Sequence, residues 1–305
     1  MTRRAPVAPA AIIVALATLA PAAGLAAQAP GSDVYLAGLT ISDRAPAGIA
    51  VAAPLNITRR AGYDNQPAFL ADERAVLYTS IRDDRQADIY RYDIAARQTT
   101  RLTGGPESEY SPTPMPGGHR FSVIRVERDS AQRLWSFALD GSDPEVVLRT
   151  VQPVGYHAWL DADHVAVYVL GRPATLQMVD VRTDQADTVA HDIDRSLSPI
   201  ATDSVSFVQR AVGGGLSLDR LWLDGAHAPH TAPIAQLPAG AAFVVWTTNG
   251  IAITASGAKL YTLLPRETSW RVAADLAPDG LANITRLAIS PNGHWLALVA
   301  DDAKP

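Results

Sequence analysis

The chain has 305 residues, of which 48% are hydrophobic, so one domain with a large apolar core is possible. It contains no cysteine, which excludes disulfides, a nucleophilic thiolate and a lipidated cysteine. With 26 basic and 31 acidic residues the net charge is −5, and such a surface disfavours nucleic acid and anionic membranes as partners.

The first segment, residues 1–29, is typical of a secretory signal peptide. Two arginines open it, an apolar stretch begins at Ala11, and small residues dominate Ala22–Ala29. We expect cleavage within Ala26–Ala29, export to the periplasm or the medium, and no membrane insertion of the mature chain. The apolar stretch is short and interrupted by proline, which disfavours the alternative of an uncleaved membrane anchor.

Residues 30–305 repeat a strand–turn–strand unit and are predicted to form one domain. In each copy a strand ends at an anchor residue, a turn rich in Asp, Asn, Gly or Pro follows, and alternating apolar residues resume. A period of this length is typical of β-propeller blades. The anchors, spaced about 41 to 46 residues apart, are Phe69, Pro114, Trp159, Ile200, Trp246 and Ile289.

A second marker follows each anchor by about 20 residues and predicts a third strand. It joins a charged, an aliphatic and a large aromatic residue, a composition suited to a half-buried strand whose aromatic residue packs between blades. The copies are Asp88–Tyr90, Arg133–Trp135, Arg220–Trp222 and Lys259–Tyr261, with Leu176–Met178 as a degenerate form. Polar fourth strands follow, so each blade is predicted to have four strands.

The two ends of the chain are predicted to complete one shared blade. The last repeat ends at Leu298 after two strands, whereas Asp33–Tyr35 carries the third-strand marker and Ala53–Thr58 occupies the place of a fourth strand. The expected fold is therefore an all-β, six-bladed propeller of four-stranded antiparallel blades, closed by N-terminal outer strands and C-terminal inner strands. An open β-sandwich array or another number of blades is the alternative.

Two turns resemble the repeats of a known family. Ser290–Gly293 reads Ser-Pro-Asn-Gly, and Ser111–Gly118 has a related pattern; both resemble the Ser-Pro-Asp-Gly repeat of the TolB-like propeller family. Related repeats occur in the propellers of prolyl-oligopeptidase-type peptidases. The resemblance covers residues 33–305 and implies a propeller without the N-terminal domain of TolB and without a hydrolase domain. Such repeats support many roles, so the resemblance predicts fold rather than function.

Motifs for catalysis and cofactors are missing from the sequence. There is no Gly-x-Ser-x-Gly elbow, no phosphate-binding loop and no dinucleotide fingerprint, so we assign no catalytic residue and expect no cofactor. The pair His227 and His230 lacks a nearby third ligand and is interpreted as loop histidines. Asp161 with Asp163, and the pair Asp83–Asp84, could ligate Ca²⁺ but fit ordinary turns equally well.

The predicted site is one mouth of the central channel. In a four-stranded antiparallel blade, the connections from fourth to first strand and from second to third strand open on the same face. Those connections are rich in Tyr and Arg, which are over-represented at binding hot spots, although ordinary polar loops are the alternative. The candidate residues are Tyr63, Asp64, Gln66, Arg82, Glu109, Tyr110, Arg125, Tyr156, His157, Arg195 and Arg286.

These patterns predict an exported, non-catalytic binding or scaffolding module. We expect a monomer that recognises a protein segment or peptide of the cell envelope. One alternative is a metal-dependent hydrolase or lactonase, suggested by analogy with gluconolactonase-like propellers, with Asp64, Glu109 and His157 as ligands. Another is a carbohydrate receptor that uses the same mouth.

Overall fold

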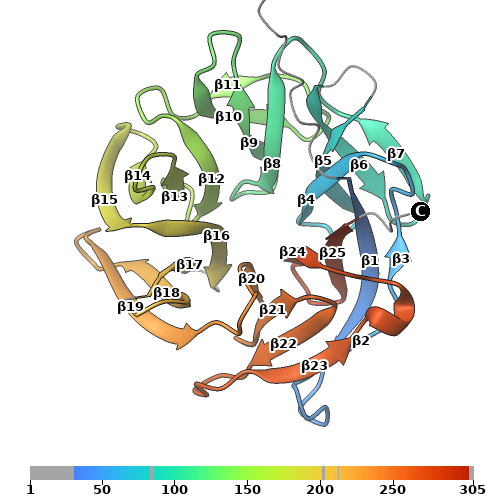
Figure 1. The fold of residues 1–305 in the computed structure, drawn as a ribbon. Coiled ribbons are helices and arrows are strands. Elements are labelled where there is room, and N and C mark those ends of the chain that lie inside the picture. Colours follow the sequence, from blue (N-terminus) through green and yellow to red (C-terminus); the bar gives the residue numbers. More distant parts are fainter. Residues whose placement is uncertain (1–30, 83–85, 201–202, 212, 302–305) are drawn as a thin grey trace, which may run out of the picture.

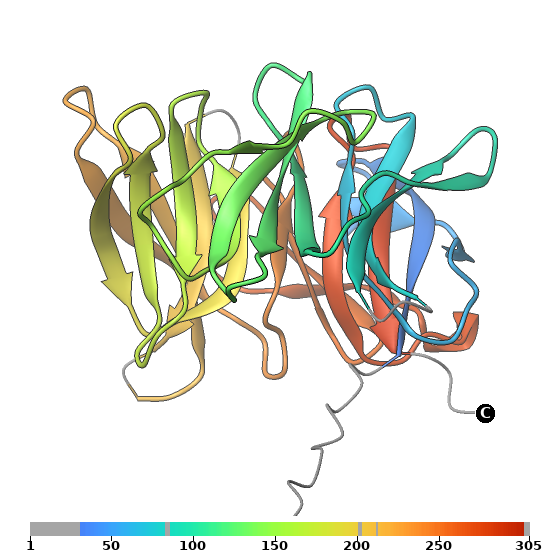
Figure 2. The same ribbon diagram turned by 90° about the horizontal axis from the view of Figure 1, so that it is seen from above.

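The computed structural model describes residues 31–82, 86–200, 203–211 and 213–301, and they form a ring of six β-sheet blades (Figure 1). The segment predicted to be a signal peptide lies outside the described residues. Seen from the side, the strands cross the thickness of the ring and the connecting loops gather on its two faces (Figure 2). The ring and its number of blades agree with the period of the sequence repeat.

Five blades are continuous in sequence, and each has four antiparallel strands in chain order from the channel outward (Figure 1). They are β4 (Tyr63–Phe69), β5 (Ala75–Ile81), β6 (Ala87–Asp93) and β7 (Gln98–Arg101); β8 (Ser108–Pro114), β9 (Arg120–Val126), β10 (Gln132–Ala138) and β11 (Glu145–Val146); β12 (Val154–Trp159), β13 (His164–Val169), β14 (Thr175–Asp180) and β15 (Gln185–His191); β16 (Ile193–Ile200), β17 (Ser204–Arg210), β18 (Leu216–Leu223) and β19 (Pro229–Gln236); and β20 (Val244–Trp246), β21 (Ala252–Ser256), β22 (Lys259–Leu263) and β23 (Arg271–Asp275).

The sixth blade is built from both ends of the chain, which confirms the predicted closure. Its inner strands are β24 (Ile284–Ile289) and β25 (Trp295–Asp301), and its outer strands are β1 (Ser32–Ile41), β2 (Ile49–Val51) and β3 (Leu55–Asn56). β1 pairs antiparallel with β25, from Ser32 opposite Asp301 to Gly38 opposite Trp295. β2 and β3 in turn pair with β1. Since β25 is thereby covered, the ring leaves no open edge at this strand.

The hydrophobic core lies between neighbouring blades. Successive side chains of a strand point to opposite faces, so a second strand flanked by two blades buries side chains on both faces. In β25, Leu296 and Leu298 pack toward one neighbouring blade, while Ala297 and Val299 pack toward the other. Six such clusters, each drawn from two blades, hold the ring together. The outermost strands are more exposed, and all four residues of β7 face solvent.

The third-strand aromatics pack less deeply than the sequence predicts. Tyr90 belongs to an inter-blade cluster, but Trp135, Trp222 and Tyr261 are only partly buried. The fully buried residue of each marker is the preceding aliphatic one: Ile89, Leu134, Leu221 and Leu260 each have 0% exposure. The aliphatic and the aromatic residue alternate between the two faces of the strand, and the face of the aromatic is covered less completely.

Helices contribute little to the described part of the chain. The only one there is the short 3₁₀ helix η1 (Ala277–Asp279), which precedes β24. Among the described residues no helix has the length and apolar composition needed to cross a membrane.

Candidate binding site at the channel mouth

The six innermost strands, β4, β8, β12, β16, β20 and β24, enclose a central channel (Figure 1). The cavity between them has a volume of about 530 Å³. Proline is found within these strands, as at Pro67, Pro112 and Pro199. Each innermost strand is the edge of its blade, so a proline there need not break a ladder hydrogen bond. The residues that line the cavity therefore come from edge strands.

One layer of the channel wall lies three residues before each anchor of the sequence repeat. In five of the six inner strands the ladder register shifts beside this position. A β-bulge redirects the side chains that follow it, so the irregularity changes which residue of each strand faces the channel. We call this set the bulge layer, and its members are Gln66, Ser111, Tyr156, Leu197, Phe243 and Arg286, all of which line the cavity.

Two arginines line the channel near the start of the innermost strands. Arg286 donates from Nη2 to the hydroxyl oxygen of Tyr156 at 2.8 Å. Its guanidinium carbon lies 4.2 Å from the ring centre of Phe243 and 4.9 Å from that of Tyr156. Arg195, on β16, is exposed, and only its backbone N–H contacts a carboxylate, that of Asp194. Within the described part of the chain, neither guanidinium group forms an ion pair.

Tyr156 contacts Arg286 directly, and Tyr63 lies within electrostatic range of both arginines and of Tyr110. Burial raises the pKa of Tyr63 to about 12; the charge of Arg286 and, more weakly, that of Arg195 oppose this shift, whereas Tyr156 and Tyr110 add to it. Burial also raises the pKa of Tyr110. Both hydroxyl groups therefore stay protonated at neutral pH and can donate hydrogen bonds. We call Tyr63, Tyr110, Tyr156, Arg195 and Arg286 the mouth cluster.

His157 lines the channel as a neutral side chain. Its Nε2 lies 2.7 Å from Oγ of Ser122, which also accepts a hydrogen bond from Nε1 of Trp159 at 2.9 Å. Burial lowers the pKa of His157 to about 3, so the ring carries no charge at neutral pH. Its buried Nδ1 has no hydrogen-bond partner among the described residues. His157 thus anchors β12 to the neighbouring blade through Ser122.

Gln66 links two blades and leaves a donor at the channel. Its Oε1 accepts hydrogen bonds from Oγ1 of Thr79 at 2.8 Å and from the backbone N–H of Ser111 at 2.9 Å. The acceptor role of Oε1 assigns the other end of the amide as the NH₂ group. No described residue accepts a hydrogen bond from that group, and Gln66 lines the cavity.

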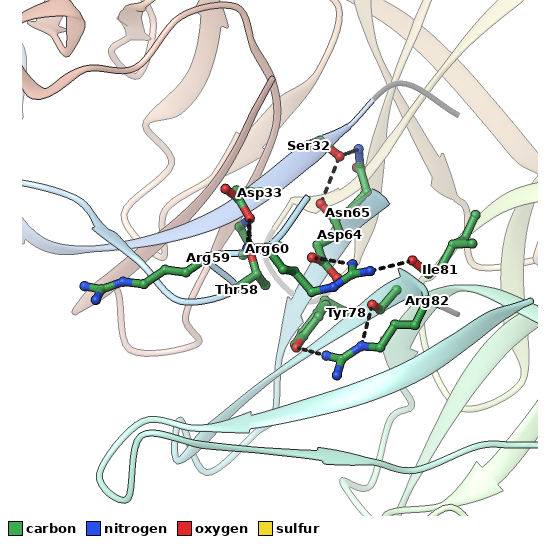
Figure 3. A network of polar contacts seen from close by, with 12 residues as sticks. Ser32, Asp33, Thr58, Arg59, Arg60, Asp64, Asn65, Tyr78, Ile81 and Arg82 are labelled. Atoms are coloured by element: carbon green, nitrogen blue, oxygen red, sulfur yellow. Dashed lines mark hydrogen bonds and ion pairs between the residues drawn. The ribbon is translucent and has the colours of Figure 1, made fainter. Parts of the chain in front are cut away.

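Asp64 and Arg82 lie in a polar network beside the closing blade rather than in the channel wall (Figure 3). Asp64 accepts a hydrogen bond from Nη1 of Arg60 at 3.0 Å, and burial raises the pKa of its carboxyl group despite that contact. Arg82 donates to Ser80 at 3.1 Å, and its guanidinium carbon lies 3.8 Å from the ring centre of Tyr90. Both side chains are thus engaged within the fold.

Glu109 and Arg125 form a pair inside the blade β8–β11. Nε of Arg125 donates to Oε1 of Glu109 at 2.8 Å, and the carboxylate is only 2% exposed. Burial raises the pKa of Glu109, although the charge of Arg125 opposes the shift. The guanidinium carbon of Arg125 also lies 4.5 Å from the ring centre of Trp135. Neither residue of the pair lines the cavity.

The candidate metal ligands do not come together. Asp64, Glu109 and His157 contact Arg60, Arg125 and Ser122 respectively. No group of three His, Asp or Glu side chains that could hold a metal ion occurs among the described residues.

The other acidic and histidine motifs are engaged locally. His227 stacks on His164 of the neighbouring blade, with ring centres 5.0 Å apart, whereas His230 stacks on Trp222. Asp161 accepts hydrogen bonds from the backbone N–H groups of Asp163 and His164. The pair Asp83–Asp84 lies outside the described residues.

The predicted residues are thus divided between two environments. Gln66, Tyr156, His157, Arg195 and Arg286 line the cavity, and Tyr63 and Tyr110 adjoin them in the mouth cluster. The sequence prediction omits Ser111, Leu197 and Phe243. Counting three residues back from each anchor, the spacing that identifies the strands, would have found them.

No family model matches the chain. Among solved structures it is similar to a protein assigned as TolB from Agrobacterium tumefaciens, with a TM-score of 0.68 and 13% identity over 90% of this chain and 99% of the other. It is similar to TolB from Acinetobacter baumannii, with a TM-score of 0.55 and 11% identity over 89% of this chain and 64% of the other. A gluconolactonase from Xanthomonas campestris has a TM-score of 0.57 and 10% identity over 80% and 88%.

These similarities concern fold, because each shares little sequence with the chain and propellers support unrelated functions. They include both TolB and an enzyme, so they do not choose between binding and catalysis. Together with the four-stranded blades and the shared closing blade, they identify the chain as a propeller of the TolB-like fold.

Proposed function

We propose that this protein is an exported binding propeller that takes a peptide or protein segment of the cell envelope at the channel mouth. The observation that carries the proposal is the mouth cluster: Tyr156 and two arginines without an ion pair among the described residues line a cavity of about 530 Å³, and Tyr63 and Tyr110 lie beside it. Tyrosine and arginine supply much of the binding energy at protein interfaces, since both join a large contact area to hydrogen-bond donors.

Two further observations support the proposal. The pattern of residues 1–29 favours export, and the fold is shared with TolB structures. The candidate metal ligands Asp64, Glu109 and His157 each have separate partners, which favours a binding role over metal-dependent hydrolysis. We expect the propeller to act as a monomer.

Site-specific photo-cross-linking tests this function. Tyr110 is replaced by the photoreactive analogue p-benzoylphenylalanine, which is close to tyrosine in shape, and the protein is irradiated with an envelope extract of the producing cells. We expect a discrete protein adduct, identified by mass spectrometry, that disappears when Tyr156→Ala is added. Val272, on the outermost strand β23 and 56% exposed, takes the same analogue as the matched control.

The control should yield no such adduct because β23 lies at the perimeter of the ring (Figure 1). Equal labelling from Tyr110 and Val272, or an adduct that survives Tyr156→Ala, would contradict recognition at the mouth.

A further inference from the structure

We infer that the segment bound at the mouth presents a carboxylate, which is held between Arg195 and Arg286. This inference rests on the proposed function and adds the chemical class of the recognised group. It follows from a local excess of positive charge in a protein whose overall charge is negative.

The carboxylates beside the mouth already have partners. Asp64 pairs with Arg60 at 3.0 Å, and Glu109 pairs with Arg125 at 2.8 Å. At the rim of the same face, Glu107 lies 3.7 Å from Arg128.

Arg195 and Arg286 have no such partner among the described residues, and no Asp or Glu is among the residues that line the cavity. Two cations therefore line the channel without an ion pair among the described residues, and the carboxylate of Asp194 contacts only the backbone N–H of Arg195.

The surroundings of Arg286 make binding of an anion more favourable. The guanidinium is only partly exposed and packs against the rings of Phe243 and Tyr156, so it has lost part of its hydration. Among the described residues its one hydrogen bond is to Tyr156, which leaves most of its five N–H donors available. A partly desolvated cation gains more from a bidentate carboxylate than a fully hydrated one does.

The rest of the wall and the residues beside it supply neutral donors rather than competing anions. The hydroxyl groups of Tyr63 and Tyr110 remain protonated, and the NH₂ group of Gln66 has no acceptor among the described residues. Oγ of Ser111 is buried in the wall and also without a partner in the described part of the chain. An anionic group that enters here meets donors from several blades.

The occupant that fits these features is a peptide segment with one or two acidic groups. The cavity has the size of a site for a few side chains. A polyanion such as nucleic acid would be repelled by the net charge of −5, whereas a short acidic segment experiences mainly the local field of the two arginines.

Calorimetric titration with defined peptides tests the inference. The probes are N-acetyl-Gly-Glu-Glu-Gly-amide, its Gln-Gln counterpart, and the Gln-Gln peptide with a free C-terminal carboxylate. The first two differ only in side-chain charge, and the third separates a terminal carboxylate from an acidic side chain. We expect a carboxylate-bearing peptide to bind roughly tenfold or more tightly than the uncharged one, with an affinity that falls as salt is added.

Arginine variants connect that preference to the site. Arg195 is exposed, so Arg195→Gln should leave folding intact and reduce the affinity for the carboxylate-bearing peptide roughly tenfold. Arg286→Gln should also reduce that affinity roughly tenfold. Arg182→Gln is the matched control, because Arg182 is 63% exposed, pairs with Asp180 and does not line the cavity. It should bind like the unmodified protein.

Each remaining outcome contradicts the inference in a different way. If charged and uncharged peptides bind equally and Tyr156→Ala weakens both, peptide recognition stands and the carboxylate preference is wrong. Digalacturonate, a sugar that carries carboxylates, is titrated as a fourth probe. If it alone binds and its binding requires Arg195, the ligand is an acidic sugar and the peptide proposal fails. If neither peptides nor digalacturonate bind, both the proposed function and the carboxylate preference are wrong.

Discussion

Arg125 and Arg286 show how a single neighbour changes what a half-buried cation can do. Both guanidinium groups lie over aromatic rings, at 4.5 Å from Trp135 and 4.2 Å from Phe243. Arg125 is neutralised by Glu109, so the pair is complete within its blade. Arg286 has no acidic partner among the described residues and donates its hydrogen bond to the neutral hydroxyl group of Tyr156. The first arginine therefore stabilises the fold, whereas the second keeps its charge for a ligand.

His157 makes the stability of the protein depend on pH. The folded state holds the ring neutral, with its pKa lowered to about 3 by burial, whereas the unfolded chain binds a proton below about pH 6.5. As pH falls from about 6.5 toward 3, the unfolded state takes up a proton that the folded state does not, so stability decreases. This contribution is fully present above pH 6.5.

Replacing His157 by Gln should remove that dependence. Between about pH 7.5 and pH 4.5, we expect the free energy of unfolding of the unmodified protein to fall by roughly 2–3 kcal/mol more than that of His157→Gln. Urea denaturation at the two pH values measures the difference. The same loss in both proteins would show that His157 is not held neutral.

Within the strands, alternation predicts burial better than residue size does. Leu221 and Trp222 are adjacent on β18, but Leu221 has 0% exposure and packs between blades, whereas Trp222 is partly exposed beside His230. The sequence marker alone favours the larger residue as the core position. The structure reverses that assignment, because the face of β18 that carries Trp222 is covered only in part.

A pair of alanine variants checks this reversal. Leu221→Ala should cost roughly 2–5 kcal/mol of stability through the cavity it leaves. Trp222→Ala should cost less, since part of its surface stays in contact with water in the folded state. Urea unfolding of both variants gives the comparison, and a larger loss for Trp222→Ala would place that side chain in the core.

The bulge layer is an element-scale feature with a local signature. Gln66 and Ser111 have φ angles of 59° and 53°, in the left-handed region that β-strands avoid. Each precedes a proline, Pro67 or Pro112, which cannot donate to a ladder. In β4 and β8 this motif explains why the residue three positions before the anchor, rather than the loop alone, faces the channel.

At the scale of the whole molecule, the closing blade is also held to the neighbouring blade by a contact between two turns. Glu73, in the turn between β4 and β5, accepts hydrogen bonds from the backbone N–H of Asn292 and contacts the ring of His294 at 3.3 Å. Burial alone would raise the pKa of Glu73, but the hydrogen bonds from Ser290, Asn292 and His294 outweigh it and lower the pKa. The contact therefore stabilises the ring above the carboxyl's ordinary pKa of 4.5 and weakens as pH falls further.

Glu73→Gln tests this fastening. We expect a loss of about 1 kcal/mol at neutral pH, since a charge-assisted hydrogen bond becomes a neutral one, and no difference once acid has protonated Glu73. Glu145→Gln is the control, because Glu145 is 63% exposed and its pairing with Arg120 is a surface contact worth little. Thermal melts at neutral and acidic pH measure both. A loss that persists in acid would not come from the carboxylate.

The blades, their order and the shared closure could be predicted from the residues alone. The evidence for them is local: turn residues, two-residue alternation and the spacing of Phe69, Pro114 and Trp159. Local features of this kind can be recognised in a sequence. The same spacing placed Tyr156, Arg195 and Arg286 near the channel. The residues that form the mouth are decided by side-chain contacts between different blades. Such contacts cannot be predicted from the order of residues in the chain.

The folded structure was needed to separate charged residues that pair within the fold from those that line the channel. Arg286 and Tyr156 are 130 residues apart yet share a hydrogen bond, whereas Asp64 is withdrawn from the channel by Arg60. The neighbours Glu109 and Tyr110 point to opposite sides of β8, so one joins Arg125 inside the blade and the other joins the mouth cluster. Pairing and desolvation are properties of the assembled ring, and they decide which charges remain for a ligand.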